Sequence, residues 1–214
     1  MNTEQTDPLI TQLKHKAEEI VKRGGDVRAE ISHLVSDTTG KFYQAKDGLA
    51  DLVKAVSEGA VTGAKEALPD KAESALHAVA NGLADGLTRS AQAVRLTLEE
   101  SRAGGVHFAT DDLDKIAKDF RAVSEIFVNI VTDAASRLGG HLSQQARTVS
   151  EHAKQTLLDV WPSLESALSA ATHDPVKLGR ESLKAGTSAA QQAAGVLFSE
   201  LGKHLQKAGE KLRH

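Results

Sequence analysis

The chain has 214 residues, a formal net charge of −3, no cysteine, one tryptophan and one tyrosine. This length is sufficient for a domain with its own core, and the lack of cysteine excludes disulfides, thiolate metal sites and cysteine nucleophiles. The 26 basic and 29 acidic residues are interspersed, which excludes a generic nucleic-acid binder. Abundant Ala, Leu, Glu, Lys and Gln favour helix over strand, so we expect an all-α fold without a sheet.

The first predicted helix begins at Asp7-Pro8, an acceptor cap followed by proline, and ends at Gly24-Gly25. A second apolar stripe runs from Asp26 to Leu68. Within it, Asp37-Thr38-Thr39-Gly40 either breaks the helix or only kinks it, and both interpretations stay open.

The next predicted segment begins after Pro69-Asp70. From Leu76 to Leu98 its apolar residues follow an almost strict seven-residue alternation, which resembles a coiled-coil seam. Gly59-x-x-x-Gly63 and Gly82-x-x-x-Gly86 place small residues on one helix face, which indicates either close helix packing or weakly packed positions. Residues 101–110 lack a helical pattern, so we predict a loop there and regard it as the best candidate for a hinge.

Residues 111–138 carry the clearest amphipathic pattern of the chain. Asp111, Asp112 and Asp114 suit the positive end of a helix dipole, and Gly139-Gly140 suits a helix end. Such a helix needs a partner surface for the apolar residues that recur at spacings of three and four, which are Leu113, Ile116, Ala117, Phe120, Val123, Phe127, Ile130, Val131, Ala134 and Leu138.

Three further helical segments complete the prediction. One runs from Leu142 to Val160 and ends at Trp161-Pro162, a short piece covers residues 163–172, and an amphipathic C-terminal helix covers about residues 176–212. We therefore predict a single helical domain over residues 1–214. Its expected architecture is an elongated bundle of about five or six antiparallel amphipathic helices.

The sequence offers little support for catalysis. Glu30-x-x-His33 has the spacing that di-iron bundles use on two of their helices, but no second copy occurs. His107 is the histidine best placed to line a pocket. No nucleophile elbow or phosphate-binding loop is present. We therefore predict a protein that is not an enzyme, with no catalytic residue, metal site or cofactor.

The segment from Gly195 to His214 combines an apolar stripe with a basic side, as interface-seeking helices do. A last bundle helix with a solvated basic side would show the same pattern, so both interpretations stay open. The candidate surface-binding residues are Val196, Leu197, Phe198, Leu201, Leu205, Leu212, Lys203, Lys207, Lys211 and Arg213.

Long Ala- and Leu-rich amphipathic helices, few aromatic residues, and the run Ser188-Ala189-Ala190-Gln191-Gln192-Ala193-Ala194 before the basic tail make the chain similar to phasins. These bacterial helical proteins coat polyhydroxyalkanoate storage granules. The resemblance implies a non-enzymatic coat on an apolar granule or lipid surface, and therefore a protein associated with granules.

The alternative is a self-contained helical bundle that acts as a protein interaction or oligomerisation module. It would bind another helical protein or a second copy of itself through the seam from Leu76 to Leu98. The opening residues lack the pattern of a signal peptide, and no uncharged segment is long enough to span a bilayer, so we expect a cytoplasmic protein without a transmembrane segment.

Overall fold

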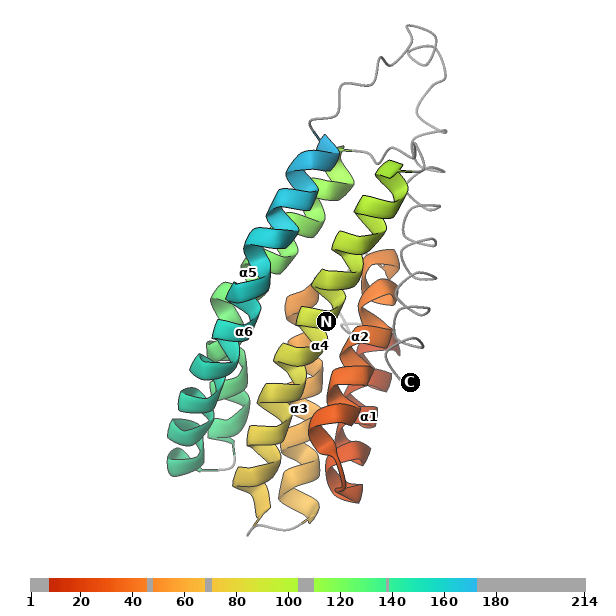
Figure 1. Cartoon of the computed structure of the whole chain (residues 1–214). Helices are drawn as coiled ribbons and strands as arrows, with labels where there is room; N and C mark the ends of the chain where they lie inside the picture. Colours follow the sequence, from red (N-terminus) through yellow and green to blue (C-terminus); the bar gives the residue numbers. More distant parts are fainter. Residues whose placement is uncertain (1–7, 46–47, 68–70, 104–109, 138, 173–214) are drawn as a thin grey trace, which may run out of the picture.

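The computed structural model describes residues 8–45, 48–67, 71–103, 110–137 and 139–172. Within these ranges it contains six α-helices and no strand, which confirms the predicted all-α bundle (Figure 1). The helices are α1 (Pro8–Arg23), α2 (Val27–Ala45), α3 (Leu49–Ala67), α4 (Ala72–Ala103), α5 (Thr110–Ser136) and α6 (Gly140–Thr172). The predicted helix over residues 176–212 lies outside the described residues.

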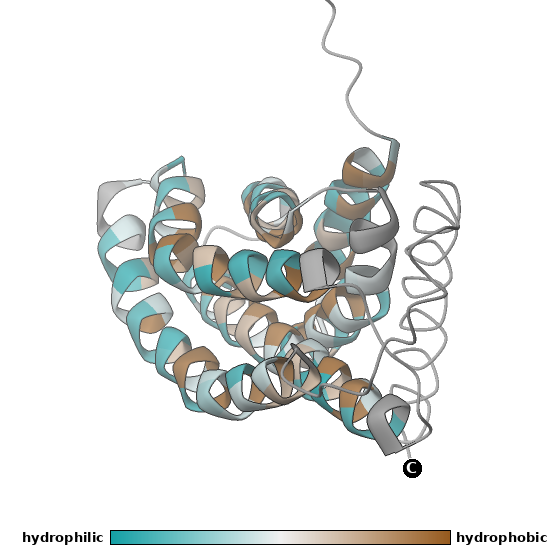
Figure 2. Ribbon diagram, turned by 90° about the horizontal axis from the view of Figure 1, so that it is seen from above, coloured by the Kyte–Doolittle hydropathy of each residue, from teal (hydrophilic) through white to brown (hydrophobic). Residues whose placement is uncertain are grey.

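The helices stand in two layers, α1–α3–α5 and α2–α4–α6, and each layer consists of helices that run in the same direction (Figure 1). Helices consecutive in the sequence are antiparallel, as predicted. The sequence pattern did not indicate which helices pack side by side: α1 packs mainly on α3, and α2 mainly on α4. Hydrophobic and hydrophilic residues alternate along the helices (Figure 2), because each helix turns one side to the core and another to water.

The apolar side of α5 packs against other helices of the same chain. Phe120 and Phe127 are buried, and Phe127 is the largest fully buried side chain among the described residues. α5 packs on α6 along most of its length and also on α3. Of the predicted stripe, Ala117 and Ile130 are only partly buried, and Leu138 lies outside the described residues.

The turn after α1 is formed as predicted. Gly24 and Gly25 have φ angles of 72° and 87°, a left-handed region in which a side chain would be strained. The backbone N–H of Gly24 donates to the carbonyl of Ile20 at 3.1 Å, which satisfies one carbonyl of the last helical turn. Asp26 then caps the start of α2, because its carboxylate accepts the N–H of Ala29 at 3.0 Å.

Residues 37–40 neither break nor end α2, which continues to Ala45. The predicted run from Asp26 to Leu68 is instead two helices, since α3 begins at Leu49. The hydroxyls of Thr38 and Thr39 donate to the carbonyls of Leu34 and Val35 at 2.5 and 2.9 Å. Both hydroxyl groups thus form hydrogen bonds within α2, and the helix continues across a sequence that is typical of turns.

Two predicted boundaries were wrong. α6 does not end at Trp161-Pro162 but runs through Pro162 to Thr172. Pro162 lies on the exposed side, and Leu164 and Leu168 continue the buried stripe beyond it, so burial outweighs the lost backbone hydrogen bond. At the other boundary, α4 extends to Ala103, so the first residues of the predicted loop over 101–110 are helical.

The seam from Leu76 to Leu98 faces the chain's own core. Leu76, Leu83, Leu87, Val94 and Leu98 are all buried against neighbouring helices of the same chain. In the closed bundle the chain itself therefore covers these side chains, and a partner that docked through this seam would have to displace neighbouring helices.

Candidate functional site

Both glycine motifs lie in close helix contacts. A Cβ atom added to Gly59 would overlap the carbonyl oxygen of Lys14, and one added to Gly63 would lie 2.5 Å from the carbonyl oxygen of Glu18. Both contacts join α3 to the parallel helix α1. This favours specific close packing over weakly packed positions, because no side chain larger than hydrogen fits at either site.

The second motif joins α4 to α2 in the same way. A Cβ atom on Gly82 would lie 2.6 Å from the carbonyl oxygen of Arg28, and one on Gly86 would lie 2.6 Å from Cβ of Val35. One turn further along, the hydroxyl of Ser90 lies 3.0 Å from that of Thr39 in a buried hydrogen bond. Each layer thus has one glycine-lined seam between parallel helices.

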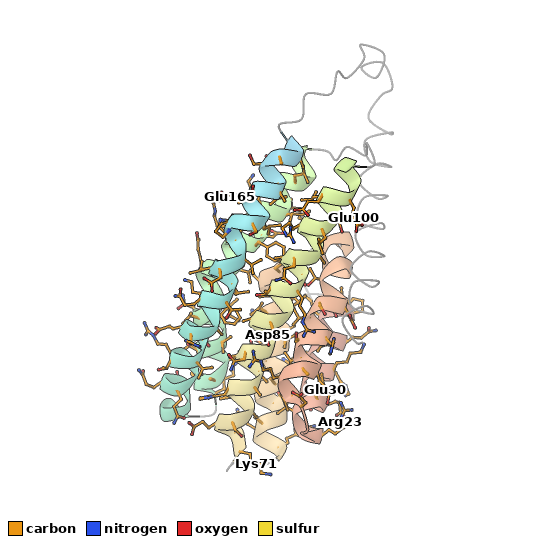
Figure 3. The ribbon with its side chains drawn as sticks, viewed as in Figure 1. Arg23, Glu30, Lys71, Asp85, Glu100 and Glu165 are labelled. Carbon is orange, nitrogen blue, oxygen red and sulfur yellow. The ribbon has the colours of Figure 1, made fainter. Side chains whose placement is uncertain are left out.

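Charged side chains connect the helices of each layer on the outside. Glu58 of α3 accepts hydrogen bonds from Lys14 of α1 at 3.0 Å and from Arg137, just after α5, at 3.1 Å. Burial raises the pKa of Glu58, but Lys14 and Arg137 together outweigh it and hold the pKa below its ordinary value. In the other layer the guanidinium of Arg28 on α2 donates to the carboxylate of Asp85 on α4 at 2.7 and 3.1 Å; Asp85 is labelled in Figure 3.

One carboxylate between α3 and α5 is poorly satisfied. The Oδ2 atom of Asp119 is buried without a hydrogen-bond partner. Burial raises the pKa of Asp119; Lys115 acts against this rise, and the negative charge of Asp51 on α3 adds to it.

The helical part described by the structure holds no group of three or more histidine, aspartate or glutamate residues arranged to bind a metal ion. Glu30, from the di-iron-like spacing, instead forms an ion pair with Arg23 at the turn between α1 and α2 (Figure 3). His107 lies outside the described residues. None of the six helices is long and apolar enough to cross a membrane.

A pocket of about 510 Å³ opens at the end of the bundle where α1 turns into α2 and α4 begins. Its floor is aliphatic, and its rim carries Lys22, Arg23, Lys71 and Ser74 beside Gly24 and Gly25. The floor consists of Val21, Val27, Ala64, Ala72, Ala75 and Ala78. Sequence reasoning missed this pocket; its signal is the run of alanines at spacings of three on α4, which leave space where larger side chains would fill it.

Outside this pocket, the described surface exposes few large apolar side chains. Leu96, Ile126 and Leu158 have exposed fractions of 44%, 37% and 40%, and each lies on a different helix. Single exposed apolar residues are common on the surfaces of folded domains. The predicted surface-binding residues, Val196 to Arg213, all lie outside the described residues.

A family model matches residues 3–207, which is nearly the whole chain, and the family is DUF6781, described as a family of unknown function. No curated protein matches the chain, and no solved structure does.

Proposed function

We propose, for a chain that belongs to the DUF6781 family, a non-catalytic role as a phasin-like coat protein on an apolar storage granule or lipid boundary. In this proposal the bundle of α1 to α6 is the water-facing body. The segment from Gly195 to His214 binds the surface, with its leucines on the apolar phase and Lys203, Lys207 and Lys211 at the boundary.

One observation carries the proposal: helices α1 to α6 bury their own apolar stripes. Their core includes large side chains from every helix, and only Leu96, Ile126 and Leu158 are exposed large apolar residues among those described. The described bundle therefore has no amphipathic face left for an apolar surface. The basic apolar stripe of residues 195–214 is the remaining sequence with the composition for that contact.

A second candidate function follows from the same closed core. A bundle that satisfies its own stripes folds without an apolar surface and can act as a module that binds another protein or a second copy. Since the seam from Leu76 to Leu98 is buried, such a partner would contact polar outer faces of the helices. Affinity would then depend on a few side chains and on charge complementarity.

Flotation of the full chain with apolar particles separates the two functions. We expect the chain to sediment with polyhydroxybutyrate particles and to float with triglyceride emulsion or anionic vesicles. It should lose this binding when Leu201 and Leu205 are both changed to Asp. The matched control is Leu158→Asp, which places the same charge at an exposed leucine of α6. Both variants should keep the thermal melt of the parent.

Emission from Trp161 reports whether the bundle stays closed. The ring is half-buried in α6, and the Arg121 guanidinium lies 5.4 Å from its centroid. Particle binding through the tail should leave this emission unchanged. Particle binding that survives the tail changes would contradict the proposal, and so would no binding to any particle; the latter result, together with a defined oligomer, would favour the interaction module.

A further inference from the structure

The pocket at the turn between α1 and α2 has the size and lining of a small-molecule site. Its volume of about 510 Å³ falls within the range of about 300 to 1,000 Å³ that is usual for ligand pockets. The space exists because Ala72, Ala75 and Ala78 line one side of it and glycines form the facing turn. Their small side chains leave the volume unfilled.

The lining restricts the chemistry of an occupant. The floor offers only methyl and methine groups, with no aromatic ring for stacking and no buried polar side chain. Such a floor suits an aliphatic chain and does not recognise polar substituents or planar rings. The ligand body is therefore a saturated or near-saturated hydrocarbon chain.

The charged residues at the rim of the pocket favour an anionic group on the occupant. Lys22, Arg23 and Lys71 line the pocket, and no acidic residue does among those described. Lys22 is already held by Glu18 and Glu66, both at 2.6 Å, and Arg23 is held by Glu30.

Lys71 stands apart from the other two rim cations. It is exposed and has no ion pair within the described part of the chain, and Figure 3 shows it at the same end as Arg23 and Glu30. Lys71 also precedes the first turn of α4, where the helix dipole adds positive potential. An anionic group at the rim would gain both interactions.

We propose that this pocket binds a free aliphatic carboxylate, with its chain on the alanine and valine floor and its carboxylate at Lys71. The proposal uses only residues between Val21 and Ala78 and does not use residues 195–214, so it does not depend on the proposed coat function. Binding would place a single acyl chain at one end of each bundle.

Calorimetric titration of the full chain with dodecanoate, below its micellar concentration and at fixed ionic strength, tests the site. We expect one dodecanoate per chain and weaker binding of dodecanol, which keeps the chain and lacks the charge. Lys71→Glu should weaken dodecanoate binding by about tenfold, because it replaces attraction at the rim with repulsion. The matched charge control is Lys54→Glu, at an exposed position on α3.

A second variant tests the floor without removing a charge. Ala75→Leu fills the pocket and should abolish dodecanoate binding while the chain keeps its thermal melt, whereas Ala122→Leu on the exposed side of α5 should change neither. Binding that is unchanged by Lys71→Glu and Ala75→Leu, or no binding at all, would overturn the site. Dodecanoate binding that disappears only with the Leu201 and Leu205 changes would assign it to the tail instead.

Discussion

The close contact between α1 and α3 at Gly59 predicts that a Gly→Ala substitution there destabilises the fold, although the same substitution usually stabilises a helix. In a helix interior, Gly→Ala ordinarily stabilises by about 1 kcal/mol, because alanine loses less backbone entropy on folding. For Gly59→Ala we expect destabilisation. The added Cβ would overlap the carbonyl oxygen of Lys14 and lie 2.8 Å from its carbonyl carbon, so the obstacle is backbone that cannot change rotamer.

The size of the effect follows from these two opposing contributions. Overpacking of a tight contact costs about 1 to 3 kcal/mol, and a clash with backbone belongs at the upper end or above it. After the gain in helix propensity of about 1 kcal/mol, the net loss of unfolding free energy is about 2 kcal/mol. For a chain of this length that loss lowers the Tm by about 4 to 8 °C.

Thermal melts followed by circular dichroism measure this loss, with urea unfolding as a second reading. The control is Ala122→Gly at an exposed site of α5, which gives the propensity contribution alone, a loss of about 1 kcal/mol. If Gly59→Ala raises the Tm by the amount that Ala122→Gly lowers it, α1 and α3 do not approach closely and the reasoning is refuted.

Three further changes test the polar contacts and the proline of α6. Glu58→Gln removes the ion pairs to Lys14 and Arg137 and should cost about 0.5 to 1 kcal/mol. Because the folded-state pKa of Glu58 is lowered, its stabilisation is present above the unfolded-state pKa and disappears as pH falls through the folded-state pKa, so the melts of parent and variant should converge in acid. Asp119→Asn should raise the Tm at pH 7, because the folded-state pKa of Asp119 is raised and the ionised carboxylate therefore destabilises the fold. The gain in Tm should shrink as pH falls. A variant less stable than the parent at pH 7 would refute this. Pro162→Ala should stabilise the chain by up to about 3 kcal/mol in urea unfolding, since the proline is exposed inside a helix. A loss of stability would mean that the backbone geometry imposed by Pro162 is needed for packing.

Sequence periodicity was sufficient to predict the helices and most of their ends. Most residues of α5 that recur at spacings of three and four are buried, and Ala117 and Ile130 are partly buried, because a 3.6-residue repeat places them on one side of the helix whatever packs there. Gly24 and Gly25 marked the end of α1 for an equally local reason, since both adopt positive φ angles. Candidate residues in the tail, from Val196 to Arg213, were also chosen from local pattern and stay a prediction.

Local pattern failed where tertiary burial opposed a local signal. Pro162 is a strong signal for a helix end, yet α6 continues because Leu164 and Leu168 are buried beyond it. The turn-like residues 37–40 remain helical because Thr38 and Thr39 bond to their own helix and lie against the core.

The sequence by itself determined that this chain forms amphipathic helices, because amphipathicity depends only on the order of side chains along a helix. Only the tertiary structure decided which helices are neighbours. Gly59 and Gly63 would allow any helix to approach α3 closely. In the structure that helix is α1, whose backbone at Lys14 and Glu18 lies against the two glycines. The burial of the seam from Leu76 to Leu98 and the pocket beside Lys71 also depend on how the helices pack. A side chain is buried, or a volume left empty, only by several helices acting together.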